Sequence, residues 1–105
     1  MAFTGQENHT ITLAAGAALT AAYRTAHPTW PKGYFFSKST LNSILAQTGC
    51  VGIRFYFGQD TAGTLKLVFA GALANEDDIL TIVGDAGALC PPLCGVSNAL
   101  NSITR

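Results

Sequence analysis

The sequence predicts an α+β fold, in which two helices pack on a small antiparallel sheet of about three to four strands. Two segments with helical spacing come first in the chain. The segment from Val51 to Phe57 then alternates large apolar residues with Gly, Arg and Tyr, as a half-buried strand does. Glycine-containing turns separate it from two further apolar runs. An antiparallel sheet of this kind packs its apolar face on one or both helices.

A length of 105 residues predicts a single domain over residues 1–105, with an extended N-terminal arm over 1–10 and a C-terminal tail over 95–105. Charged side chains make up 11% of the chain, with six Lys and Arg against six Asp and Glu, whereas a typical soluble domain carries about 25%. Without a basic stripe we expect no nucleic-acid partner. Apolar runs are too short for a membrane span. The polar start lacks a cationic signal region, so we expect the cytoplasm, with export without a cleaved signal peptide as the alternative.

The first helix is expected to begin near Thr12, a good N-cap, and to end near Ala26, before Pro28. Its wheel is apolar on nearly all sides, because alanine and leucine occupy most of the circumference. Only a weakly polar sector interrupts them, formed by Thr12, Gly16, Thr20, Arg24 and His27. Such a helix is normally buried on nearly all sides, so the side turned away from the core needs a partner. The alternative interpretation is that alanine simply favours the helix and is tolerated in water.

Residues 28–36 predict a loop that runs into a short extended segment. Its aromatic residues are expected to pack in or around the core, with a stacking platform for bases or sugars as the alternative. A second helix is expected from Ser37 or Ser39 to about Gln47. We predict that Leu41, Ile44 and Leu45 form its buried stripe. Gly49 is predicted to be its left-handed C-cap.

The predicted strands follow in order along the chain. Val51–Phe57 directs Val51, Ile53, Phe55 and Phe57 to one face. A hairpin over 59–63 uses Gly63 for a positive φ, and the returning strand covers 64–70, with residues 71–75 leading out of it. A third strand is expected over 79–83. Arg54 is predicted to form an ion pair with Asp77, Asp78 or a neighbouring subunit, or else to lie in solvent, and the acidic run 76–78 is predicted to be a solvated turn rather than a calcium loop.

Three cysteines, Cys50, Cys90 and Cys94, leave three chemical states open. They could form a disulfide within or between copies, remain buried thiols, or bind zinc together with His9 or His27. Cys90 and Cys94 form one closely spaced pair of potential metal ligands, whereas structural zinc sites commonly use two such pairs. We therefore predict no metal site, with these three cysteines as the candidates should zinc be bound. We predict no catalytic or cofactor-binding residue, because the only bases for a Cys50 nucleophile would be His9 and His27.

Several of these segments together resemble a group of small bacterial proteins of unknown function. The resemblance lies in Leu45–Tyr56, whose sequence is LAQTGCVGIRFY, in the strand over 65–70, in Asp78-Ile79, and in the late CPPLC of residues 90–94. It covers about residues 11–95. It implies no activity, since none is known for the group. This chain is poorer in charge, above all in the first helix, and this departure favours assembly.

The sequence predicts a self-assembling structural protein that forms a homo-oligomer, with an open filament or tube as one form. Few charges and an apolar helix leave patches that need covering, and a head-to-tail contact between such patches propagates unless its rotation closes a ring. The expected self-contacts are Leu13, Ala14, Ala18, Ala22 and Trp30. The alternative is a small metal- or redox-active thiol protein that uses the three cysteines, and an enzyme is not expected.

Overall fold

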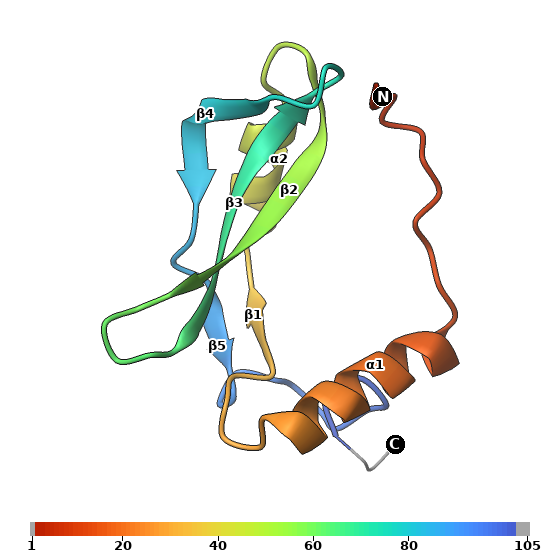
Figure 1. Cartoon of the computed structure of the whole chain (residues 1–105), viewed down its shortest axis with the longest axis vertical. Coiled ribbons are helices and arrows are strands. Elements are labelled where there is room, and N and C mark those ends of the chain that lie inside the picture. Colours follow the sequence, from red (N-terminus) through yellow and green to blue (C-terminus); the bar gives the residue numbers. More distant parts are fainter. Residues whose placement is uncertain (1, 103–105) are drawn as a thin grey trace. The chain divides into compact units, whose positions relative to one another are not determined.

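The computed structural model describes residues 2–102 and confirms the α+β class. Two helices accompany a three-stranded antiparallel sheet of order β2-β3-β4 and a two-stranded antiparallel sheet of β1 and β5 (Figure 1). The chain divides into two compact units. The first holds residues up to Asn8 together with Phe36–Gly87, and the second holds His9–Phe35 and the residues from Ala88 onward. The single domain expected from chain length stays a prediction.

The first unit is organised around a long hairpin. β2 (Cys50–Gln59) pairs with β3 (Leu65–Leu73) from Gln59↔Leu65 back to Cys50↔Leu73, with a bulge between Cys50 and Gly52. β4 (Asp78–Gly84) pairs with only four residues of β3, Phe69–Ala72, and this pairing is itself irregular. The half of the hairpin next to its turn is therefore a two-stranded ribbon that extends past β4 (Figure 1). As predicted, Gly63 adopts a positive φ in this turn.

β3 is longer than expected, because residues 71–73 continue the strand instead of leading out of it. Gly71 makes this possible. A Cβ at that position would lie 2.9 Å from Cys50 Sγ and 3.2 Å from Ile44 Cγ2, so the missing side chain leaves room for the helix above the strand. The helix and the strand therefore lie close together at Gly71, which the sequence pattern alone did not show.

α2 (Lys38–Leu45) covers part of one face of this sheet. The Ser37 side chain caps it by accepting a hydrogen bond from the Thr40 N–H. Ile44 is fully buried, but Leu45 is exposed, so its predicted place in the buried stripe was wrong. Gly49 has the predicted left-handed φ of 78°, but it lies in the turn before β2, since Ala46 is the C-cap.

Phe69 forms the centre of the core of the first unit. Its side chain is fully buried, and its ring lies 4.5 Å from that of Phe36 and 5.1 Å from that of Phe55. Gly84 of β4 pairs with it directly and is itself buried. The described core is small and contains Ile44, Phe69, Ala70 and Ala72.

The second unit contains α1 (Leu13–Ala26), β1 (Gly33–Phe35) and β5 (Ala88–Cys90). Thr12 is the predicted N-cap, and its Oγ1 accepts a hydrogen bond from the Ala15 N–H at 3.0 Å. The two short strands pair antiparallel from Gly33↔Cys90 to Phe35↔Ala88. Sequence patterning identified β1 only as an extended segment and β5 only as part of an aperiodic stretch, because three residues are too few to show alternation.

Candidate self-association surface

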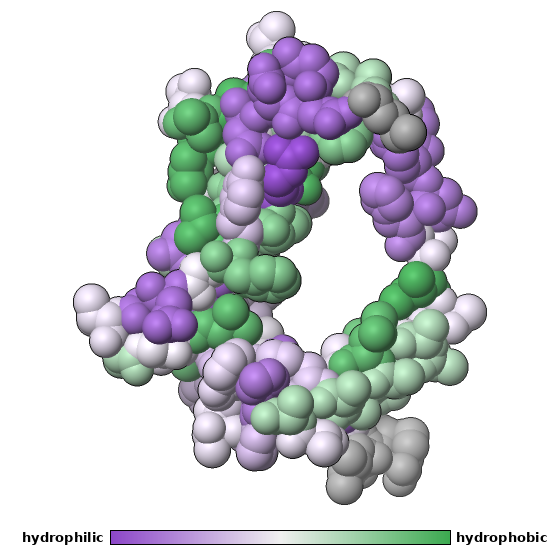
Figure 2. Space-filling view, viewed as in Figure 1, coloured by the Kyte–Doolittle hydropathy of each residue, from purple (hydrophilic) through white to green (hydrophobic). Residues whose placement is uncertain are grey.

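The outer face of α1 is apolar, although no residue of this helix is buried. At 100° per residue, the exposed residues other than Leu13 gather on one side of the helix, and Leu13 at the helix start lies on the opposite side. The residues that gather together are Ala14, Ala15, Ala18, Leu19, Ala22, Thr25 and Ala26, and we call them the α1 stripe. Figure 2 shows apolar residues along this helix. A surface helix normally turns its polar face outward, so α1 has the opposite arrangement.

The weakly polar sector of α1 faces the C-terminal segment of the same unit. The Arg24 Nη1 donates a hydrogen bond to the Leu100 carbonyl oxygen at 2.9 Å. A Cβ at Gly16 would lie 3.4 Å from the Leu100 side chain, so this glycine also marks the inner face. Gly16 and Arg24 thus lie on the inner side, and most of the alanines of the helix, apart from the half-buried Ala17 and Ala21, remain outside.

All five predicted contact residues are exposed. Leu13 is 64% exposed, Trp30 is 43% exposed, and Ala14, Ala18 and Ala22 lie on the outer side of α1. Their role as self-contacts stays a prediction.

Trp30 lies just beyond the end of the helix within a cluster of aromatic rings. Its ring stacks on His27 with centroids 3.8 Å apart and meets Tyr23 edge-on at 6.4 Å. The Tyr23 hydroxyl donates a hydrogen bond to the Pro31 carbonyl oxygen at 2.7 Å, and burial raises the pKa of Tyr23. The aromatic loop is therefore fastened to the helix end, and Trp30 projects from a supported position.

A second exposed apolar region lies on β2, where the sequence placed Phe55 and Phe57 on the covered face. Phe55 packs on the buried Phe69 ring and is 48% exposed, but Phe57 is 82% exposed, so the expectation was wrong for Phe57, next to the hairpin turn. The reason is length. An eight-residue helix is about 12 Å long, whereas a ten-residue strand extends about 33 Å. Comparing the two segment lengths in the sequence could have revealed the uncovered end.

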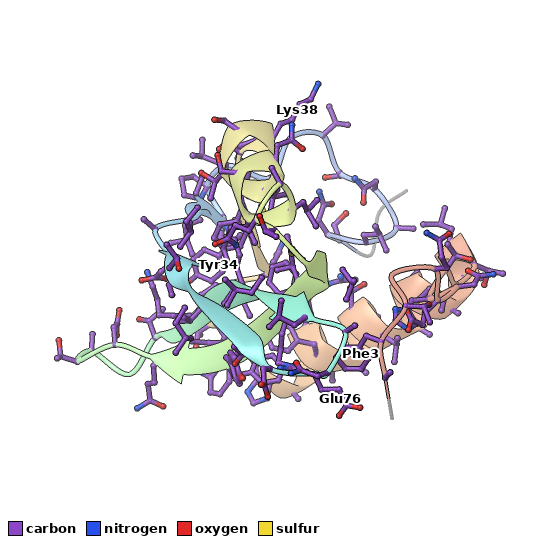
Figure 3. The ribbon with its side chains drawn as sticks, turned by 90° about the horizontal axis from the view of Figure 1, so that it is seen from above. Phe3, Tyr34, Lys38 and Glu76 are labelled. Atoms are coloured by element: carbon purple, nitrogen blue, oxygen red, sulfur yellow. A yellow bond between two sulfur atoms is a disulfide. The ribbon has the colours of Figure 1, made fainter. Side chains whose placement is uncertain are left out.

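The other face of β2 holds the predicted ion pair of Arg54. Its Nη1 lies 2.5 Å from Asp78 Oδ1 and donates a second hydrogen bond to the Glu76 carbonyl oxygen at 3.0 Å. The Tyr56 hydroxyl donates to Asp78 Oδ2. The Phe3 ring covers the guanidinium at 5.5 Å, and Figure 3 shows Phe3 beside the turn that carries Glu76.

This network shifts the pKa of each of its two charged members. The hydrogen bond from Tyr56 and then the Arg54 guanidinium hold the pKa of Asp78 below its ordinary value. The hydrogen bond to Asp78 raises the pKa of Arg54. The single charge on β2 is therefore neutralised within the same chain. The side chains of Asp78, Arg54 and Tyr56 thus hold one another in place through the ion pair and the hydrogen bonds.

The cysteines occupy two separate situations. Cys90 and Cys94 form a disulfide, and Cys50 is a free thiol whose Sγ donates to the Gly52 carbonyl oxygen at 3.2 Å. Cys50 belongs to the first unit, whereas the disulfide belongs to the second. Within residues 2–102, no group of three His, Cys, Asp or Glu side chains is placed to hold a metal ion.

Comparison of the chain with protein-family models, with curated proteins and with solved structures finds no match. The resemblance to the small bacterial proteins therefore stays a prediction. Neither helix in the described part of the chain has the length and apolar composition needed to cross a membrane.

Proposed function

We propose that this chain is a self-assembling structural protein that forms a homo-oligomer, with a filament or tube as the extended form. The observation that supports the proposal is the reversed polarity of α1. Its alanine-rich stripe faces outward, while Arg24 and Thr20 lie on the inner side. Apolar surface of this kind is stabilised when it leaves water, and a second copy supplies a matching surface.

The composition of the α1 stripe suits contact between two helices. Alanine side chains allow helix axes to approach to the lower end of the usual 8–10 Å range. Leu19, 68% exposed, supplies the one large side chain on the stripe itself, with Leu13 at the helix start. With 11% charged residues, the chain also has few like charges to oppose such an approach.

The size of α1 limits what this contact can do alone. Fourteen residues make a helix about 21 Å long and about 10 Å wide, so one face covers on the order of 200 Å² per copy. Stable interfaces bury about 1,200–2,000 Å² in total. Pairing through α1 is therefore weak by itself, and a lasting assembly uses further contacts, of which Trp30 is one candidate.

The proposal is tested by Ala18→Glu, which places a charge in the middle of the α1 stripe. Because Ala18 is exposed, the fold should persist, and the circular dichroism spectrum should match that of the unchanged protein. The matched control is Ala86→Glu, which adds the same charge at an exposed turn position outside α1. Light scattering should show smaller particles for Ala18→Glu and unchanged particles for Ala86→Glu. Equal particle sizes for Ala18→Glu and the unchanged protein would refute the α1 contact.

No second function is proposed. The metal- or redox-active alternative stays a prediction, with Cys90 and Cys94 joined as a disulfide in one unit and Cys50 a free thiol in the other.

A further inference from the structure

The three-stranded sheet has two edges that differ in kind. β4 is short, pairs with only four residues of β3, and is interrupted where Ala70↔Val83 is followed by Gly71↔Ile79. Short and bulged edges of this kind discourage pairing with another chain. β2 has ten residues, and its only irregularity lies between Cys50 and Gly52. From Ile53 to Gln59 it is a regular edge strand.

The sequence of this edge carries none of the usual protection. Natural edge strands are shielded by lysine, proline or inward-pointing charges. Residues 53–59 read IRFYFGQ, and their only charge, Arg54, is paired with Asp78. Phe55, Tyr56 and Phe57 are 48%, 46% and 82% exposed. Three exposed aromatic residues thus follow one another on the strand that has a regular open edge.

The backbone direction can be read from the hairpin register. The Asp60 N–H donates to the Thr64 carbonyl oxygen at 3.1 Å, so residue 60 points its backbone groups toward β3. Antiparallel pairs alternate between hydrogen-bonded and non-hydrogen-bonded residues. The even-numbered residues 54, 56 and 58 therefore bond to β3. Residues 53, 55, 57 and 59 point their N–H and C=O groups to the outer edge.

We infer that β2 pairs antiparallel with β2 of a second copy, about a two-fold axis at Tyr56, and joins two three-stranded sheets into one of six strands. This register keeps the whole of Ile53–Gln59 paired. It places Phe55 opposite Phe57 twice and Arg54 opposite Gly58, which leaves room for its side chain. About eight backbone hydrogen bonds form, all from the outward-pointing residues.

The chemistry of the edge favours a second copy as its occupant. Cross-strand aromatic pairs stabilise a sheet, and this strand supplies both members of each pair. Arg54 is already neutralised by Asp78, so the two copies bring no unbalanced charge together. The three aromatic side chains expose roughly 350 Å² per copy if each offers about 200 Å² in full. Two copies thus offer about 700 Å² of aromatic surface, less than the roughly 1,200 Å² of the smallest stable interfaces, so we expect a weak dimer that forms only at high concentration.

Edge pairing adds a second contact to the assembly proposed above. The β2 dimer does not depend on the proposed function, but the formation of a polymer from such dimers does. One isologous contact yields a closed dimer. A chain with two different isologous contacts, one through α1 and one through β2, links dimers into an open polymer unless the symmetry closes.

The test uses the full chain carrying Ala18→Glu, in which the α1 contact is removed, so that the edge is measured alone. Sedimentation of this variant from micromolar to near-millimolar concentration should show a monomer–dimer equilibrium. Adding Phe57→Lys should raise the dimer dissociation constant at least tenfold, because it places a charge at the edge. The matched control, adding Leu80→Lys at a similarly exposed position on β4, should change it less than twofold.

The outcomes separate the two proposals. A dimer that Phe57→Lys disrupts supports edge pairing even if the unchanged protein shows no larger assembly. A monomer in the Ala18→Glu background overturns edge pairing. If that variant is a monomer while the unchanged protein still assembles, the result supports the α1 contact. A dimer that is equally insensitive to Phe57→Lys and Leu80→Lys also overturns edge pairing.

Cross-linking tests the register directly. In a Cys50→Ser background, Tyr56→Cys places two thiols at the two-fold axis, where paired Cα atoms are about 4.5–5.5 Å apart and a disulfide fits. Mild oxidation should give a covalent dimer. Gln59→Cys in the same background is the control, because two residues 59 would lie about 20 Å apart along the strands. Cross-linking at residue 59 without cross-linking at 56 would overturn the register.

Discussion

Replacing Gly84 by alanine tests the core of the first unit. A Cβ at this position would lie only 2.5 Å from Phe69 Cε2 and 2.7 Å from its Cε1. Carbon atoms without a bond between them are normally about 3.5–4.0 Å apart. Either the Phe69 ring or the β4 backbone must therefore move by about an ångström.

The ring has little room to move. Phe69 is fully buried, and the rings of Phe36 and Phe55 lie on it at 4.5 and 5.1 Å. Overpacking of a core costs about 1–3 kcal/mol, and the tight surroundings place Gly84→Ala toward the upper end. A loss of about 2–3 kcal/mol corresponds to a fall in melting temperature on the order of 10–15 °C for a unit of this size.

Thermal melting followed by circular dichroism measures this effect. The control is Gly52→Ala in β2, where a Cβ would meet nothing within 4 Å, and its melting temperature should change little. Phe69→Leu combined with Gly84→Ala should be less destabilised than the sum of the two single changes, because the smaller side chain makes room. Equal melting temperatures for Gly84→Ala and Gly52→Ala would refute the proposed packing of Phe69 against β4.

Two further predictions concern the disulfide and the ion pair. Cys90→Ser combined with Cys94→Ser should lower the free energy of unfolding by about 2 kcal/mol, because a five-residue loop loses its closure, and a chemical-denaturation midpoint equal to that of the unchanged protein would contradict the bridge. Because the folded pKa of Asp78 is lowered, its contribution to stability is present above the unfolded pKa and is lost as pH falls through the folded pKa. Asp78→Asn should therefore lower the melting temperature at pH 7 but progressively less below about pH 4, and a pH-independent difference would count against the ion pair.

The sequence predicted the elements whose signals are local. Thr12 as the N-cap of α1, a strand over Val51–Phe57 and the positive φ of Gly63 each depend on a few neighbouring residues, and all three are found. The candidate contact residues on α1 were predicted from the helical wheel, and they are exposed. The ion pair of Arg54 with Asp78 was one of the predicted pairings.

The features that were missed depend on residues far apart in the chain. The extension of β3 through Gly71 requires the close approach of α2, and the exposure of Phe57 requires the helix to end short of the strand. The pairing of β1 with β5 joins two three-residue segments about 55 residues apart, which no periodicity can show. Which cysteines pair was left open, because spacing alone does not select among disulfide, metal and free thiol.

Sedimentation of the unchanged protein, with negative-stain microscopy of the same samples, addresses self-association most directly. We predict that the average mass rises steadily between micromolar and near-millimolar protein, and that elongated particles appear at the upper end. A single monomeric species of about 10.9 kDa across the whole range would contradict the account.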